Sequence, residues 1–147
     1  MYRFKQGDLQ VFLAHPGGPF HVHKEEGGWT IPKGGGERGE LLLTAAIREF
    51  REETGLEPHG PYLELGDIRQ KSGKIVHAWA FVGDHDATQP VRSNFFEMEW
   101  PPDSGRMQSF PEVDRAQFFS LGEAKKKLRP TQWPLVERLV EVLKKNA

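Results

Sequence analysis

The most regular hydrophobic pattern in the chain lies in residues 41–54. Leu43, Ile47 and Phe50 recur there at helical spacing, so that one side of a helix over this stretch would be apolar. Gly55 follows directly, at the position where a residue in the left-handed conformation ends many helices. The pattern therefore predicts an amphipathic helix over 41–54 that ends at Gly55.

Two further helices and several strands are predicted around this helix. Residues 121–128 and 134–145 have helical patterns. Apolar segments typical of strands cover residues 9–14, 29–31, 62–65, 75–82, 95–100 and 116–119. Segment 75–82 is apolar on both faces, which predicts a central strand of a sheet. Strands with helices on two sides indicate a layered α/β fold.

Length and composition favour one domain over residues 1–147. A chain of 147 residues can bury a core of ordinary size, and 37% hydrophobic with 28% charged residues is typical of soluble proteins. The absence of cysteine excludes disulfide bonds and thiolate metal sites. Because the net charge is −1 and neither a membrane-spanning run nor a signal-peptide pattern is present, we expect a cytoplasmic monomer or homodimer. Its partner would be a small molecule rather than nucleic acid or a membrane.

Three carboxylates share the polar side of the predicted helix. Glu49, Glu52 and Glu53 stand at i, i+3 and i+4, where side chains on a helix are neighbours. Their repulsion costs about 0.2–0.5 kcal/mol per pair, and a hard divalent cation such as Mg²⁺ or Mn²⁺ would offset it. Arg48 can orient Glu52 from one turn away, and Glu40 reaches the same region from the preceding loop. The alternative is a solvated charged face, which is what most helical charge runs are.

A glycine-rich turn leads into this helix. Residues 29–36 read WTIPKGGG, and consecutive glycines let the backbone approach a ligand closely. Backbone amides and carbonyls exposed in such a turn can hold phosphate or metal. We therefore expect Lys33 and Gly34 to contact the substrate, with the Lys33 side chain on a phosphate.

The whole stretch from Gly34 to Leu56 follows the pattern G-x5-E-x7-R-E-U-x-E-E-x-G-U, where U is an apolar residue. This pattern resembles the signature of the Nudix hydrolases, and no position departs from it. The segment W-x-I-P-K-G-G before it is also similar to Nudix sequences. The resemblance implies a Nudix-type α/β/α sandwich with a mixed β-sheet, and hydrolysis of a phosphoanhydride bond with Mg²⁺ or Mn²⁺.

The resemblance also implies a role for each residue of the motif. Glu49, Glu53 and Arg48 would be catalytic. The metal ligands would be Glu49, Glu52, Glu53 and the main-chain carbonyl of Lys33, with Glu40 and Gly55 supporting the motif. Glu52 and Glu53 are expected as the main ligands, and Glu49 as general base or bridging ligand. Nudix enzymes differ over which glutamate is the base, so this assignment stays open.

The start of the chain departs from the family pattern. Nudix domains usually open with a longer first strand, whereas Met1-Tyr2-Arg3-Phe4 begins where that strand would be ending. Either the chain is shortened at its N-terminus, in which case we expect a shortened first strand, or its start was assigned too late.

Similar resemblances indicate three candidate residues outside the motif. Glu112 stands where many Nudix proteins carry an acidic residue, which in some of them is a metal ligand or base; an acid in a surface loop is the alternative. Lys74 and His77 belong to the pattern K-x-x-G-K-x-V-H. That pattern is similar to a phosphate-binding region of diadenosine-polyphosphate and diphosphoinositol hydrolases, whereas a turn with solvated lysines is the alternative.

A long connection is predicted over residues 101–111. Loops of this length in compact domains are often functional. We expect it to cover the site, with Arg106 and Phe110 contacting substrate and either Phe110 or Trp29 stacking on a base.

Three substrate hypotheses follow. The first is a nucleoside diphosphate linked to another moiety, with a dinucleoside polyphosphate such as diadenosine tetraphosphate (Ap4A) favoured by Lys74 and His77. The second is a (d)NTP pyrophosphatase, because the C-terminal two-thirds resembles bacterial Nudix proteins described as predicted NTP pyrophosphohydrolases. The third is a nucleotide sensor without catalysis, against which the intact motif argues. Ser72, Gly73 and Lys74 occupy the stretch where many Ap4A hydrolases carry a tyrosine, and the corresponding proline of ADP-ribose hydrolases is missing.

Overall fold

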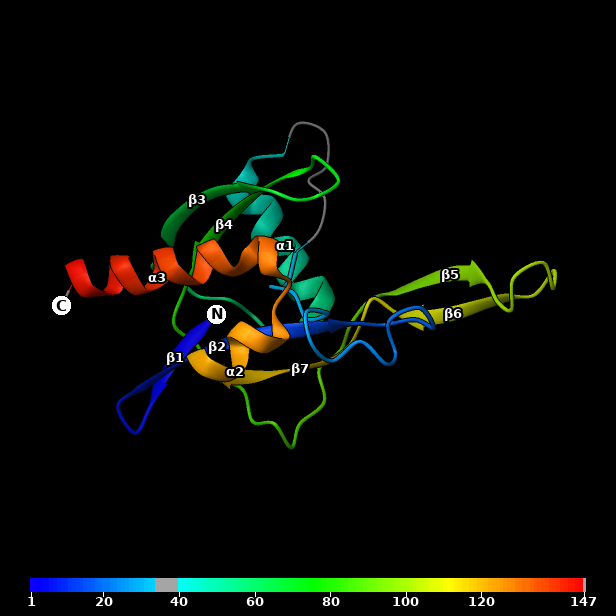
Figure 1. Cartoon of the computed structure of the whole chain (residues 1–147), viewed down its shortest axis with the longest axis horizontal. Helices are drawn as coiled ribbons and strands as arrows, with labels where there is room; N and C mark the ends of the chain where they lie inside the picture. The colour runs from blue at the N-terminus through cyan, green and yellow to red at the C-terminus, as the bar shows by residue number, and fades with distance from the viewer. Residues whose placement is uncertain (34–39, 147) are drawn as a thin grey trace.

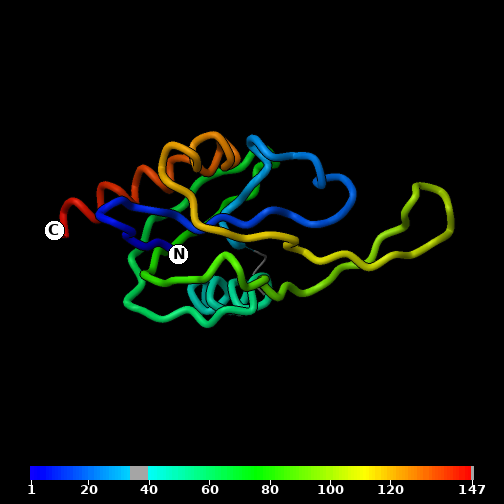
Figure 2. The backbone as a smooth tube through the Cα atoms, turned by 90° about the horizontal axis from the view of Figure 1, so that it is seen from below, coloured from blue at the N-terminus to red at the C-terminus, as the bar shows by residue number. Residues whose placement is uncertain are grey.

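The structure is a computed structural model that describes residues 1–33 and 40–146. Its elements, in chain order, are β1 (Tyr2–Lys5), β2 (Asp8–Pro16), α1 (Leu42–Thr54), β3 (Leu63–Arg69), β4 (Ile75–Ala80), β5 (Phe95–Glu99), β6 (Met107–Pro111), β7 (Val113–Ser120), α2 (Leu121–Lys127), the 3-10 turn η1 (Pro130–Gln132) and α3 (Trp133–Lys145). Strands lie between α1 on one side and α2 with α3 on the other (Figure 2). This arrangement confirms the predicted α/β sandwich.

The strands pair in three antiparallel groups. β2 is the centre of a three-stranded sheet between β1 and β7, β3 pairs with β4, and β5 pairs with β6. Within the described ranges, parallel pairing occurs as isolated bridges, and Tyr2 with Val82 is one of them. The Tyr2 backbone N–H donates to the Phe81 carbonyl at 3.0 Å, which links β1 to the end of the β3–β4 hairpin. The mixed character of the sheets therefore rests on such isolated bridges, and β1 has four residues.

The core lies where β2 meets the helices. Leu13 is fully buried, and Leu128 and Trp29 are each 1% exposed. Trp29 packs edge-on against Phe119 of β7, with ring centroids 4.9 Å apart. Because Trp29 is enclosed in this core, the expectation that it stacks on a base was wrong.

Helix α1 forms as predicted. Its apolar side packs through Phe50, whose ring lies 5.1 Å from that of Phe81 and 6.4 Å from that of Phe12. Gly55 has φ 74° and its N–H donates to the Arg51 carbonyl at 2.8 Å, so it ends the helix in the left-handed conformation. The acidic side of the helix is thereby fixed opposite the core.

Segment 75–82 is not a central strand, so that prediction was wrong. β4 ends at Ala80 and pairs along its length with β3. Val76 and Ala78 are buried and pack with Leu135 of α3, whereas Ile75 and His77 are exposed. One face of β4 thus meets α3 and the other borders a groove beside α1, which explains why apolar residues occur on both faces.

Two other expectations need correction. Segment 29–31 forms single bridges, Thr30 with Ala14 and Trp29 with Leu128, rather than a strand. Residues 101–111 are not a loop over the site, because residues 107–111 form β6 and pair with β5. The resulting hairpin projects away from the rest of the molecule (Figure 1).

No helix in the part of the chain that the structure describes is long and apolar enough to cross a bilayer.

Candidate active site

Arg48 organises the acidic side of α1. Its Nε and NH2 groups donate to the two carboxylate oxygens of Glu40 at 2.9 and 3.0 Å. Its NH1 group donates to both oxygens of Glu52 at 3.1 Å and lies 3.0 Å from Glu49 Oε1. The hydrogen bonds that Arg48 donates to Glu40 and then to Glu52 raise the pKa of Arg48, so the guanidinium stays charged. One cation therefore holds three carboxylates in place. The contact with Glu52 was predicted from the sequence, whereas Glu40 was expected only to reach the same region.

Glu53 is held by a different partner. The backbone N–H of Lys33 donates to Glu53 Oε2 at 2.7 Å. Burial raises the pKa of Glu53 to about 7, and this hydrogen bond opposes the rise. Burial also raises the pKa of Glu49, against the effect of Arg48. Glu53 is thus a largely buried carboxylate beside the Lys33 peptide, poised near neutral pH.

A cavity of about 140 Å³ opens in front of Glu53. Its lining residues are Ala14, Pro16, Thr30, Lys33, Glu53, Glu112, Val113 and Arg129. Glu112, a candidate from the sequence, is brought here by the backbone: its N–H donates to the Asn94 carbonyl at 2.8 Å, and the Asn94 N–H donates to the Glu52 carbonyl at 2.7 Å. Glu53 and Glu112 therefore face one cavity although 59 residues separate them.

Basic side chains surround this cavity. Burial lowers the pKa of Lys33, and the charges of Lys74 and Arg129 lower it further. Lys33 and Lys74 were candidates from the sequence, but Arg129 was missed. No local pattern marks Arg129, because it follows the short helix α2 and reaches the cavity only through the tertiary fold.

A second hollow of about 130 Å³ lies between α1 and β4. Lys33, Lys74 and His77 line it together with apolar side chains that include Leu42, Ile75 and Trp79. His77 Nδ1 lies 4.0 Å from Asp67 Oδ2 on the neighbouring strand. The structure thus brings Lys33, Lys74 and His77 to one groove, and Lys33 joins this groove to the cavity at Glu53.

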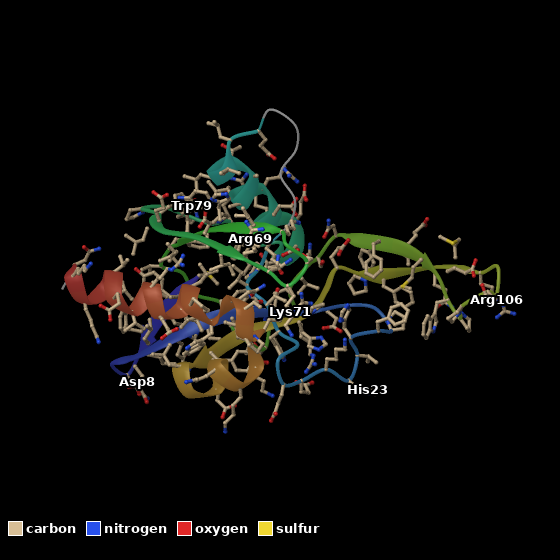
Figure 3. All side chains as sticks on the ribbon, turned by 45° about the horizontal axis from the view of Figure 1, so that its top comes forward. Asp8, His23, Arg69, Lys71, Trp79 and Arg106 are labelled. Atoms are coloured by element: carbon tan, nitrogen blue, oxygen red, sulfur yellow. The ribbon has the colours of Figure 1, made fainter. Side chains whose placement is uncertain are left out.

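Other candidates lie elsewhere. Arg106 is at the far end of the β5–β6 hairpin, away from the body of the molecule (Figure 3). Phe110 packs against Phe96 across the same hairpin, with ring centroids 5.9 Å apart. Neither residue lines the cavity at Glu53 or the groove at His77. Gly34 lies outside the described residues.

The carboxylates suit a hard divalent cation. Within residues 1–33 and 40–146, no three acidic or histidine side chains converge into a preformed metal cage. Mg²⁺ does not need one, because it usually takes one or two carboxylates and completes its octahedral shell with water and substrate phosphate. Glu53 is half-buried, has no ion pair among the described residues and lines one cavity with Glu112. These oxygens fit the metal that the sequence predicted.

The chain resembles known proteins over most of its length. The model of the NUDIX domain matches residues 5–139. The asymmetrical bis(5'-nucleosyl)-tetraphosphatase of Rattus norvegicus is 42% identical over 65 residues, which are 40% of this chain and 44% of that protein. This chain thus matches less than half the length of the rat protein.

Two solved structures share the fold. The C. elegans Ap4A hydrolase in a binary complex superposes with a TM-score of 0.59 at 24% identity, over 97% of this chain and 92% of that one. The E. coli ORF135 protein superposes with a TM-score of 0.53 at 25% identity, over 95% and 84% of the two chains. The family match covers the motif helix, the Glu53 cavity and the strands that frame it, and the chain therefore belongs to the NUDIX domain family.

Proposed function

We propose that this protein is a Nudix hydrolase that cleaves a phosphoanhydride bond of dinucleoside polyphosphates with Mg²⁺ or Mn²⁺. The observation that carries the proposal is the cavity in which Glu53 and Glu112 face Lys33 and Arg129. Acidic oxygens for a metal and cations for phosphates are both needed to bind a polyphosphate, and here they line one space. The likeness to the rat tetraphosphatase supports the choice of substrate.

Different residues would bind the metal and the phosphates. Glu52, Glu53 and Glu112 would hold the cation, with the Lys33 carbonyl as a further ligand. A divalent cation, when bound, neutralises phosphate oxygens and activates water for attack. Arg48 keeps the Glu49 carboxylate in place at 3.0 Å, and Glu49 accepts the proton of the attacking water. Lys33 and Lys74 bind the phosphate oxygens of the substrate.

The groove between α1 and β4 would take a nucleoside. Leu42, Ile75 and Trp79 offer apolar surface for a base, and Lys33 lies between that surface and the metal-binding carboxylates. A nucleotide seated there would present its phosphates to Glu53. The α1–β4 groove and the Glu53 cavity therefore suit a substrate with a nucleoside at one end and a phosphate chain beside the carboxylates.

Changing Glu53 to Gln tests the proposal. We expect Glu53→Gln to lower kcat at least ~10²-fold, because the amide neither neutralises nor ligates the cation as a carboxylate does. The measurement is ATP release from Ap4A with Mg²⁺ or Mn²⁺, resolved by chromatography. Glu141→Gln, an exposed glutamate on α3, is the matched control and should keep full activity.

Three outcomes would count against parts of the proposal. Near-normal turnover by Glu53→Gln would refute the role of that carboxylate. Pyrophosphate release from a (d)NTP with Ap4A left intact would support the pyrophosphatase instead. No turnover of either substrate by the unmodified protein would support a nucleotide sensor.

A further inference from the structure

A third hollow adjoins the cavity at Glu53. It has a volume of about 290 Å³ and is lined by Gly27, Gln70, Lys71, Ser72, Arg129, Pro130 and Thr131. Lys71 stands over the middle of the molecule, at the turn between β3 and β4 (Figure 3). Arg129 lines both this hollow and the cavity that contains Glu53 and Glu112. The two spaces therefore meet at one residue, Arg129.

The backbone around Arg129 is fixed on both sides. The Arg129 N–H donates to the Trp29 carbonyl at 2.9 Å, and the Gln132 N–H donates to the Arg129 carbonyl at 2.9 Å. Gln132 Oε1 accepts a hydrogen bond from the Ile31 N–H at 2.9 Å, which ties the same turn to the segment that leads to Lys33. The backbone position of Arg129 relative to Lys33 is thus set by these hydrogen bonds.

Among the described residues, Arg129 belongs to a group of cations without ion pairs, although Glu53 and Glu112 line the cavity that it borders. In the described part of the chain, neither Arg129 nor Lys33 nor Lys74 forms an ion pair. Lys71 adds a fourth cation at the edge of the hollow, and the residues that line this hollow include no carboxylate. Burial lowers the pKa of Lys33 most, repulsion from Lys74 and Arg129 lowers it further, and the charge of Glu53 opposes the change, so these groups act on one another. Uncompensated cations held together in this way favour an anionic ligand.

The lining of this hollow differs from that of the α1–β4 groove. Gln70, Ser72 and Thr131 supply hydrogen-bonding groups, and large apolar side chains are absent from its lining residues. A volume of about 290 Å³ lies near the lower end of the range for small-molecule sites. Such a space suits a sugar phosphate better than a stacked base.

We propose that Arg129 is a specificity-determining residue, which binds a phosphate of the second nucleotide where the substrate passes from the carboxylate cavity into this hollow. The inference rests on the proposed function, since it assigns the two ends of a dinucleoside polyphosphate to two different hollows. One nucleoside occupies the α1–β4 groove, the phosphate chain crosses Glu53, and the second nucleotide leaves past Arg129. Because Arg129 also lines the carboxylate cavity, a mononucleotide meets it there, but only a dinucleotide extends past it into the hollow.

Kinetics of Arg129 variants test this assignment. We expect Arg129→Ala to raise KM for Ap4A ~10- to 100-fold and to change kcat less than ~3-fold, because a charge-assisted contact is lost away from the reacting bond. Arg129→Lys should recover only part of the loss, since an ammonium cannot make the bidentate contact of a guanidinium. Turnover and binding of ATP should weaken at least ~3-fold less than those of Ap4A, because ATP does not extend into the hollow. The matched control is Lys126→Ala, which removes the same charge from an exposed position three residues away.

Binding separates this inference from the proposed function. Titration calorimetry with Ap4A and Ca²⁺ in place of Mg²⁺ reports affinity even if the unmodified protein hydrolyses nothing. An Arg129→Ala Kd at least ~10-fold weaker for Ap4A, with a loss of ATP affinity at least ~3-fold smaller, supports the assignment. Equal Ap4A affinities for the variant and the unmodified protein would overturn it, as would an equal loss on Ap4A and ATP. Far-ultraviolet circular dichroism melting establishes that each variant is folded.

Discussion

At the scale of single residues, the site depends on where each carboxylate finds its partner. Glu40, Glu49 and Glu52 share the Arg48 guanidinium, whereas Glu53 receives only the Lys33 N–H at 2.7 Å among the described residues. Burial therefore acts more strongly on Glu53 than the stabilising contact does, and its pKa rises to about 7. The ionised form of such a carboxylate is unfavourable without a cation, so a bound cation stabilises it strongly.

This pKa predicts how stability depends on pH. Glu53 titrates near 4.5 when unfolded and at about 7 when folded, so the folded protein holds an extra proton between these values. Without metal, the free energy of unfolding should fall as pH rises through that window, by about 1–3 kcal/mol from this residue. Glu53→Gln should remove this part of the dependence and be more stable than the unmodified protein at pH 8. Urea denaturation of both proteins in EDTA at pH 5 and pH 8 measures it, and an unchanged stability difference at the two pH values would contradict it.

At the scale of elements, the end of α1 sets the position of the segment around Arg92 and Asn94, which leads into β5. The Gly55 N–H closes the helix, and the Arg92 N–H donates to the Thr54 carbonyl at 2.9 Å. A Cβ atom on Gly55 would lie 2.9 Å from Arg92 Cβ and 3.0 Å from the Arg92 carbonyl oxygen. The same segment continues to Asn94, which links Glu52 to Glu112. The helix end therefore influences the acidic cavity as well as stability.

Gly55→Ala is expected to destabilise the protein by about 1–3 kcal/mol, because φ 74° is unfavourable for alanine and the added methyl meets Arg92. It should also reduce activity, through displacement of Glu112. Thermal unfolding and Ap4A turnover measure the two effects. Gly73→Ala is the control: its φ is also positive, at 88°, but nothing lies within 4 Å of its Cβ position, so it should cost less. Equal losses for the two variants would show that contact with Arg92 has no role.

At the scale of the whole molecule, the sandwich and the projecting hairpin have separate roles. The sandwich brings β2, α1, β7 and the turn after α2 around one cavity. The β5–β6 hairpin extends away from that cavity (Figure 1) and carries Arg106 at its outer end (Figure 3). Substrate binding should therefore depend on the turn after α2 rather than on the tip of the hairpin.

Arg106→Ala is accordingly expected to leave KM for Ap4A within ~2-fold of the unmodified protein, in contrast to Arg129→Ala. Both variants remove one arginine, so a general effect of net charge would change both alike. Steady-state kinetics at two salt concentrations compare them. A large rise of KM in Arg106→Ala would show that the hairpin reaches the substrate after all.

Local patterns account for what the sequence predicted well. The amphipathic helix over 41–54, the Gly55 cap and the contact of Arg48 with Glu52 depend on residues at most four positions apart, and helical spacing alone brings those side chains together. Segment 75–82 was wrongly predicted to be a central strand. Both faces of β4 meet other elements, so apolar residues occur on both faces even though the strand is not central. The hairpin was missed because residues 101–111 combine a turn with a strand whose partner lies earlier in the chain.

The sequence by itself determined the family, the motif helix and the acidic side chains, since these follow from spacing along one element. Only the tertiary structure decided that Glu112 faces Glu53, that Arg129 joins Lys33, and that Arg106 and Trp29 lie elsewhere. Those placements depend on the pairing of β2 with β7 and on hydrogen bonds between segments about 100 residues apart, such as Gln132 with Ile31. Contacts of that range are set by packing of the whole core, and no local spacing encodes them.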